Sequence, residues 1–114
     1  MSEDCLFCRI ASGEAEAEIV DEDDRWVAFR DVNPQAPTHV LVIPREHVEN
    51  LNDVEPGGEE LLGELLMAVR RVAESEGLDE GYRVVANNER QAGQSVFHLH
   101  FHVLGGRAMG WPPG

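Results

Sequence analysis

Near the carboxyl end of the chain, residues 97–103 alternate apolar side chains with histidines in the order Phe-His-Leu-His-Phe-His-Val. Successive side chains of a β-strand point to opposite faces of its sheet, so this alternation predicts a strand with two unlike faces. The side chains that would pack on the core are Phe97, Leu99, Phe101 and Val103. Those of the opposite face are His98, His100 and His102.

The histidine face of this strand indicates a function. Each imidazole has polar atoms to satisfy and can gain a charge near neutral pH, so three in line are costly to keep without a use. The chain has only five histidines. We therefore interpret the three as functional, and metal ligation, nucleophilic attack at phosphorus, or both are open to them.

A second pattern, over residues 59–76, predicts the one long helix. Acidic side chains occupy its first turn, and Gly77 supplies a left-handed stop. Apolar residues recur at the three- and four-residue spacing of one helix face. They are Leu62, Leu65, Leu66, Val69, Val72 and Ala73.

The other patterns predict a short helical turn over residues 4–13 and several short strands. The predicted strands are residues 19–20 and 25–30, which form a hairpin, then 39–43, 82–86 and 97–104. Strands outnumber helices and most connections are short. We therefore expect the α+β class, with one helix packed across a face of an antiparallel sheet.

The length of the chain favours one domain, residues 1–114. A domain of this size buries roughly 60 to 70% of its unfolded surface, which sustains a core of 42% hydrophobic residues without disulfides. No run approaches the ~18 apolar residues of a membrane span, and the amino terminus lacks the regions of a secretory signal. We therefore expect a cytoplasmic protein.

Charge excludes several classes of partner. The chain has 22 acidic and 9 basic residues, a formal net charge of −13. Such a surface repels phosphate backbones and anionic lipid, so we expect neither a nucleic acid nor a membrane partner. All the basic residues are arginines. Adaptation to a salt-rich cytoplasm and a GC-rich genome are both compatible with this composition.

The two cysteines, Cys5 and Cys8, are too few for a secreted disulfide scaffold. In a reducing compartment, a C-x-x-C pair indicates metal or redox chemistry. We favour zinc over a redox pair, because Phe7 lies inside the pair and no βαβ context of the thioredoxin type surrounds it. Tetrahedral zinc needs two further ligands.

Residues 98–103 resemble the H-φ-H-φ-H-φ signature of the histidine triad superfamily. Residues 104–114 resemble the tail of its Hint branch, and residues 31–44 and 92–96 are similar to further Hint segments. The similarity spans nearly the whole chain. It implies a HIT-like fold with a five-stranded antiparallel sheet, one long helix and a short N-terminal helix, and a homodimer that joins two such sheets.

This resemblance also implies an activity, the hydrolysis of purine nucleoside 5′-phosphoramidates such as AMP-NH2 or AMP-lysine through a nucleotidyl-histidine intermediate. His100 would attack the α-phosphorus, because a neutral imidazole nitrogen is a good nucleophile at pH 7. His102 would hydrogen-bond a non-bridging phosphate oxygen, and His39 would support the triad. The Ser95 hydroxyl would donate towards the leaving nitrogen.

The substrate contacts carried over by the resemblance form a further set. Asp31 would accept hydrogen bonds from the ribose hydroxyls. The phosphate would contact Asn87 and the loop of Gly93, Gln94 and Ser95, although residues 89–91 depart from the Gly-rich stretch usual in Hint proteins. Trp111 would reach the active site of the partner chain. The apolar purine slot would comprise Leu6, Phe7, Ile10, Phe29 and Val32, of which Phe7 and Phe29 are also compatible with ordinary core.

The resemblance to zinc-carrying bacterial and archaeal members completes the metal site. His47 and His98 match the positions that join Cys5 and Cys8 in a Cys2His2 site. Such a zinc would be structural, with no open coordination position, and would tie the N-terminal turn to the sheet.

Three other functions stay open at this level. A dinucleoside polyphosphate hydrolase of the Fhit type would use the same nucleophile, although the tail of residues 111–114 favours Hint. A nucleotide-binding regulator with incidental hydrolysis would share the same residues. A zinc-dependent scaffold without a nucleotide role is disfavoured, because zinc would occupy only one histidine of the triad.

Overall fold

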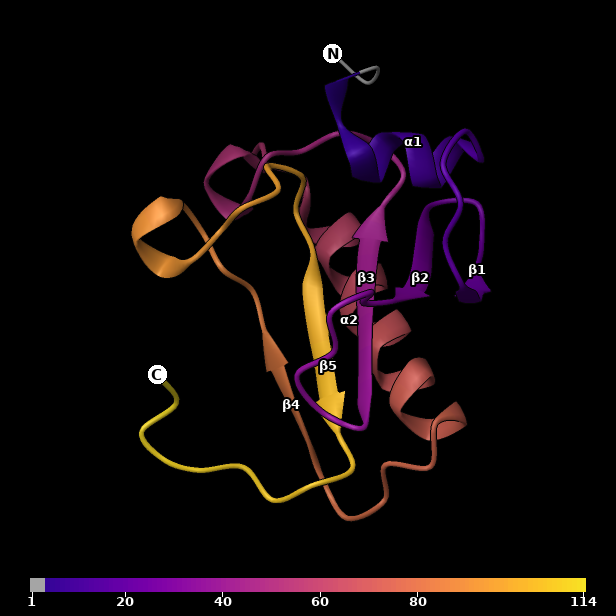
Figure 1. Ribbon diagram of the computed structural model, residues 1–114. Coiled ribbons are helices and arrows are strands. Elements are labelled where there is room, and N and C mark those ends of the chain that lie inside the picture. The colour runs from indigo at the N-terminus through magenta and orange to yellow at the C-terminus, as the bar shows by residue number, and fades with distance from the viewer. Residues whose placement is uncertain (1–3) are drawn as a thin grey trace.

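The computed structural model describes residues 4–114, which form one five-stranded antiparallel sheet in the order β1-β2-β3-β5-β4 (Figure 1). The strands are β1 (Ile19–Glu22), β2 (Trp26–Arg30), β3 (Thr38–Pro44), β4 (Tyr82–Val85) and β5 (Phe101–Gly105). The helices are α1 (Leu6–Ser12) and α2 (Glu59–Ser75), with 3-10 turns η2 (Leu51–Asp53) and η3 (Arg90–Ala92). The expected α+β class is confirmed. Neither helix is long and apolar enough to cross a membrane.

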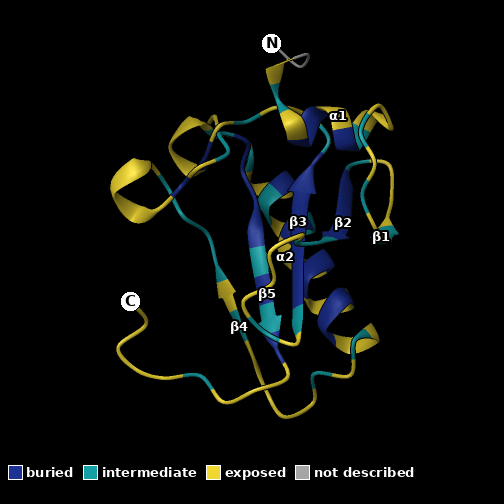
Figure 2. Cartoon of the chain, viewed as in Figure 1, coloured by how far each residue is buried: buried dark blue, intermediate teal, exposed yellow. Residues whose placement is uncertain are grey.

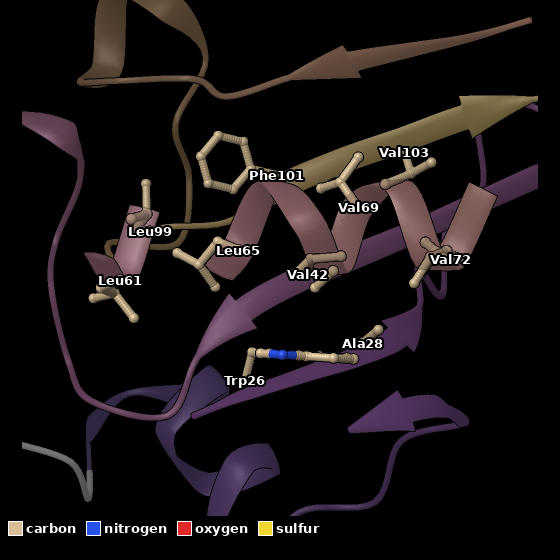
Figure 3. Packing of buried hydrophobic residues seen from close by; sticks show 12 residues of the cluster. Trp26, Ala28, Val42, Leu61, Leu65, Val69, Val72, Leu99, Phe101 and Val103 are labelled. Atoms are coloured by element: carbon tan, nitrogen blue, oxygen red, sulfur yellow. The ribbon is translucent and has the colours of Figure 1, made fainter. Parts of the chain in front are cut away.

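The long helix α2 covers one face of the sheet (Figure 1). Its buried stripe packs on side chains of β2, β3 and β5 (Figure 3). The stripe comprises Leu61, Leu65, Ala68, Val69, Val72 and Ala73. The inclusion of Leu66 in this face was wrong, because it lies about 100° around the helix from Leu65 and is 50% exposed.

The short helix α1 packs on the opposite face of the same sheet. Strand alternation explains how the two faces divide: Val40 and Val42 of β3 belong to the cluster under α2, whereas Leu41 and Ile43 belong to the cluster under α1. By the same alternation, His39 of β3 lies on the α1 side. The central strands are buried, whereas β4 and the C-terminal tail are largely exposed (Figure 2).

The strand predicted over residues 97–104 is shorter than expected, because the ladder with β3 begins only at Phe101, opposite Val42. Continued in this register, Leu99 would face Pro44, which has no N–H to donate. The Leu99 N–H instead donates to the carbonyl of Val48 at 2.6 Å. Proline thus limits the pairing to the end of the histidine run: His102 lies in the ladder, whereas His98 and His100 precede it.

The predicted alternation nevertheless persists beyond the ladder. Leu99 belongs to the core cluster under α2, together with Phe101 and Val103. Phe97 does not, and its expected place in the core was wrong: the ring is half-buried, with the Arg90 guanidinium 5.9 Å from its centroid. Core packing of Leu99, rather than strand pairing, therefore fixes the facing of His98 and His100, whereas His102 lies in the ladder.

Candidate active site and metal centre

His39 and His102 meet on the α1 face, where β3 and β5 pair. The Gln35 N–H donates to His39 Nδ1 at 3.0 Å, so in the neutral ring the proton is on Nε2. His39 Nε2 lies 2.8 Å from His102 Nδ1, to which it donates. This bond places the proton of the neutral His102 ring on its own Nε2. One backbone amide thus sets the tautomers of both rings.

The Nε2 atom of His102 is buried and has no hydrogen-bond partner within residues 4–114. Buried polar atoms in folded proteins are nearly always paired, because an unpaired one loses its hydrogen bonds to water. An N–H in this state is suited to an acceptor that arrives with a ligand.

His100 has the opposite arrangement of its ring nitrogens. Its Nδ1 donates to the carbonyl of His98 at 2.7 Å, which leaves a lone pair on Nε2. The ring is only 7% exposed, and Phe7 packs edge-on against it with centroids 5.1 Å apart. His100 therefore offers a nucleophilic nitrogen beside the donor of His102.

Burial keeps these imidazoles neutral. It is the largest cause of the lowered pKa values of His39 and His100, partly opposed at His100 by the hydrogen bond to His98. The pKa of His102 is lowered to about 4, first by burial and then by the neighbouring histidines. Burial thus favours the neutral form of all three rings.

A cleft of about 430 Å³ opens over these rings. Its walls include Asp31, His39, His100, His102 and Ser95, so the structure brings the four candidate catalytic residues and the candidate ribose ligand together. They also contain all five residues of the expected purine slot, which are Leu6, Phe7, Ile10, Phe29 and Val32.

Four residues expected at the substrate do not line the described walls of this cleft: Asn87, Gly93, Gln94 and Trp111. The side chain of the neighbouring Asn88 is engaged internally: it donates to the Ala86 carbonyl and accepts from the Leu51 N–H. The side chain of Gln94 is buried, and that of Trp111 is 83% exposed.

Sequence reasoning missed several residues of the cleft, namely Glu16, Ala17, Arg30, Asn33, Gln35, Leu41 and Val96. Leu41 could have been found, because it follows His39 by two positions in one strand. Gln35 acts through its backbone amide, for which no side-chain signal exists. Arg30 is engaged by Glu76 at 3.0 Å and Glu18 at 3.3 Å. The Arg30 guanidinium is therefore already paired with two carboxylates of the chain.

Asp31 follows β2, and both of its carboxylate oxygens have defined surroundings. Oδ1 accepts from the Asn33 N–H at 2.8 Å, and Oδ2 lies 3.4 Å from His39 Nε2. The side chain is 19% exposed. Each oxygen has a second lone pair, so the carboxylate can still accept hydrogen bonds from a ligand.

The second cluster joins Cys5, Cys8, His47 and His98, whose ligand atoms all lie within 4.8 Å of one another. His98 Nδ1 is 3.3 Å from Cys5 Sγ and 3.4 Å from Cys8 Sγ. His47 Nδ1 is 3.3 Å from Cys8 Sγ and from His98 Nδ1. Tetrahedral zinc with bonds of about 2.0 to 2.3 Å separates its ligands by about 3.3 to 3.8 Å, so the donors and their spacing fit.

The surroundings of His98 support this interpretation. Its Nε2 donates to the carbonyl of Pro44 at 2.8 Å, which leaves the Nδ1 lone pair directed at the two sulfurs. Burial and the adjacent Cys5 raise the pKa of Cys8 to about 11. A divalent cation would reverse that preference by stabilising both thiolates.

The cysteine cluster is linked to the cleft through α1. Cys5 caps the helix, with its Sγ accepting from the Cys8 N–H at 3.3 Å, and the helix carries Phe7 and Ile10 into the cleft wall. His47 and His98 belong to the segments that follow β3 and precede β5. A metal here would fasten one wall of the cleft to the sheet.

Comparisons with known proteins agree with this geometry. The HIT domain family matches residues 12–109. An uncharacterized HIT-like protein of Synechococcus elongatus is 53% identical over 114 residues, the full length of both chains. A HIT family hydrolase of Legionella pneumophila is 51% identical with a TM-score of 0.94, covering 96% of this chain and 99% of that one. A histidine triad nucleotide-binding protein of Candida albicans is 34% identical with a TM-score of 0.82, covering 95% and 82%.

Proposed function

Because this chain belongs to the HIT family, we propose that it hydrolyses purine nucleoside 5′-phosphoramidates such as AMP-NH2 or AMP-lysine. Several solved relatives are named HIT family hydrolases, which supports a hydrolase. The observation that carries the proposal is that one cleft holds a nitrogen with a free lone pair beside a nitrogen with an N–H to donate. His100 offers a lone pair at Nε2, and His102 offers an N–H that has no partner among residues 4–114.

In the first step of the proposed reaction, His100 Nε2 attacks the α-phosphorus and the P–N bond to the leaving amine breaks. The His102 Nε2–H donates to a non-bridging oxygen, where negative charge grows in the transition state. The leaving nitrogen takes up one proton from solvent through the Ser95 hydroxyl, which donates towards it, and departs as a neutral amine. The bond from His100 Nδ1–H to the His98 carbonyl stabilises the positive charge on the nucleotidylated ring.

In the second step, water attacks the phosphorus, gives up its proton to solvent and breaks the bond to His100, which releases the nucleoside monophosphate and restores the neutral ring. Binding holds the substrate in line for both steps. The purine would lie among Phe7, Ile10 and Phe29, and the Asp31 carboxylate would accept from the ribose hydroxyls. A cleft of about 430 Å³ is of the size that small-molecule sites have.

We propose that Cys5, Cys8, His47 and His98 hold a structural zinc. When bound, the ion would supply four bonds to protein ligands and leave no open position for substrate. The chain's own contribution is to hold Phe7 and Ile10 against the sheet through α1. This role predicts that metal loss disturbs the cleft wall and the stability rather than the nucleophile.

We also propose that the protein is a homodimer. Among the described strands β4 is an edge strand paired with β5, and its Tyr82 and Val84 are 42% and 39% exposed. A hollow of about 900 Å³ adjoins this edge and the tail. Trp111 is held near the edge by Arg83, whose guanidinium lies 6.0 Å from its ring and donates to Gly110 O.

Pairing of two such edges would join the sheets and bring Trp111 towards the partner's active site. Light scattering at micromolar concentration tests this arrangement. The expected mass is twice the 12.7 kDa of one chain, and a monomer would contradict it.

The proposed reaction is tested by incubating the protein in parallel with adenosine 5′-monophosphoramidate and with diadenosine polyphosphates. Faster turnover of the phosphoramidate is expected. Preference for the dinucleotides would instead indicate a hydrolase of the Fhit type. Tight nucleotide binding with negligible turnover of either would indicate a regulator.

A further inference from the structure

Two loops meet beside the triad through a buried pair of amide side chains, Asn50 and Gln94. Asn50 is 0% exposed and Gln94 is 4% exposed, although both lie outside helices and strands. Asn50 follows the metal-binding candidate His47, and Gln94 immediately precedes Ser95. The pair thus connects the segment after β3 with the loop that leads into the triad.

Every hydrogen-bonding position of the Gln94 side chain is occupied. Its Nε2 donates to the carbonyls of Glu49 at 2.7 Å and Val96 at 3.1 Å. Its Oε1 accepts from Asn50 Nδ2 at 3.0 Å and from the Glu89 N–H at 2.8 Å. An amide has two donors and two acceptor lone pairs, so the side chain has no capacity left for a substrate.

Asn50 extends the same network. Its Nδ2 also donates to the carboxylate of Glu89 at 3.0 Å, and its Oδ1 accepts from the Asn52 N–H at 2.9 Å. Glu89 has φ +76°, the only positive φ at a non-glycine residue of the described chain. A residue with a β-carbon rarely adopts this conformation, and the contacts with Asn50 and Gln94 hold it there.

The network fixes the backbone on both sides of Ser95, whose side chain is exposed. The bond from Gln94 Nε2 to the Val96 carbonyl bridges the two residues that flank Ser95 in the chain. The bond to the Glu49 carbonyl fixes the same amide to the neighbouring loop. Ser95 lines both the cleft over the triad and an adjoining hollow of about 350 Å³. Only Leu6, Ser95 and Val96 are common to both walls.

We propose that Gln94, held by Asn50, is a positioning residue that fixes the Ser95 hydroxyl at the point where the leaving amine departs. The inference rests on the proposed phosphoramidase function, and it assigns Gln94 a role in the departure step rather than in substrate binding. A shift of the serine by about 1 Å in the absence of this support would be enough to slow the reaction about a hundredfold.

The test uses two substrates that differ only in the leaving group. Adenosine 5′-monophosphoramidate needs a hydrogen bond to its departing nitrogen, whereas the 4-nitrophenyl ester of AMP releases a stable anion without one. We expect Gln94→Glu, which loses both donors, to lower kcat for the phosphoramidate about tenfold to a hundredfold, with KM changed less than about threefold. For the nitrophenyl ester, kcat should change less than about threefold.

A double-mutant cycle then shows whether Gln94 acts through Ser95. With the phosphoramidate, Gln94→Glu should cause no further loss in a Ser95→Ala background. Gln91→Glu is the matched control, because it adds the same charge to an exposed position of the same loop and should retain wild-type rates. Asn50→Asp, which removes the donors to Gln94 and Glu89, should show the same substrate dependence and serves if Gln94→Glu does not fold.

The role of Gln94 would be overturned if Gln94→Glu lowered kcat equally for both substrates, or if it lowered kcat as much in the Ser95→Ala background as in the wild type. Either result would leave the proposed function intact. If the wild-type protein hydrolyses neither substrate, or if His100→Ala retains full activity on both, the proposed function itself fails. Retention of wild-type kcat on the phosphoramidate by folded Gln94→Glu and Asn50→Asp would also overturn the inference.

Discussion

The two faces of the sheet are built from the same strands and differ in almost every other respect. Under α2 the strands present valines, Trp26, Ala28 and Phe101, Leu99 joins them from just before β5, and the seventeen-residue helix seals the cluster from water. Under α1, a helix of seven residues, the apolar cluster is interrupted by His39, His100 and His102, and a cleft remains. One face therefore stabilises the fold, and the other holds polar groups at a defined spacing above that rigid base.

The comparison predicts its largest effect at His100. Its replacement by alanine removes the nucleophile and little of the cleft wall, so turnover of adenosine 5′-monophosphoramidate should fall by about a thousandfold or more. Nucleotide affinity, measured by calorimetry, should change only severalfold. A variant that keeps a tenth of the wild-type turnover would defeat the covalent mechanism.

On the α2 face, a substitution should lower the stability of the fold and leave the turnover almost unchanged. Leu65→Ala creates a cavity in the fully buried centre of the cluster and should lower the free energy of unfolding by about 2 to 5 kcal/mol. The rate per folded molecule should change little. Leu66→Ala is the matched control, because the same deletion at a half-exposed position should cost less than about 0.5 kcal/mol in chemical denaturation. Equal losses at the two positions would contradict the packing described.

Metal removal should lower stability and disturb the cleft wall, because the cysteine cluster supports α1, whereas its contact with His100 is the backbone carbonyl of His98 and not a ligand atom. Freshly isolated, reduced protein should carry about one zinc per chain. Cys8→Ser or chelation should lower the melting temperature more than it lowers the rate per folded molecule. Leu65→Ala separates the causes, since it should lose stability and keep its zinc by metal analysis. Absence of zinc from the wild-type protein would exclude the proposed site.

The pH dependence of kcat and of stability tests whether the imidazoles are buried. Burial lowers the pKa of His100 below its ordinary 6.5, so the neutral ring should persist, and kcat should decline only at pH values below 6.5. The unfolded chain binds protons at ordinary values, whereas His102 has a pKa of about 4 in the fold. Stability should therefore fall as the pH drops from 6.5 towards 4. A kinetic midpoint at or above 6.5 would contradict this burial effect.

The smallest expected effect arises from the charged outer surface, which belongs to neither of the two packed faces. A net charge of −13 repels itself until salt screens it, with a Debye length of about 3 Å at 1 M against about 10 Å at 0.1 M. The melting temperature should rise between 0.1 M and 2 M KCl. An unchanged value would favour a GC-rich genome over salt adaptation as the origin of the lysine-free composition.

The sequence predicts the α2 face and the histidine face well, because periodicity alone determines which side chains share a side. It predicts strand ends poorly. β5 begins at Phe101 rather than at Phe97 because Pro44, on another strand, cannot continue the ladder. The start of β5 depends on its register with another strand, and no local sequence pattern reveals that register.

The candidate site shows the same division. The triad and the C-x-x-C pair could be found from spacing, whereas the Gln35 amide that sets two histidine tautomers could not. Gln94 was expected at the substrate, yet its side chain is fully engaged by four protein groups. Long-range hydrogen bonds decide whether a polar side chain near a site is available to a ligand.

The central claim is that the α1 face uses His100 as a nucleophile at phosphorus. It is tested most directly by mixing the protein with adenosine 5′-monophosphoramidate, quenching during turnover and locating any adduct by mass spectrometry. We predict a single adenylyl group on His100, absent from His100→Ala. Turnover without an adduct, or an adduct on another residue that persists in His100→Ala, would contradict the account.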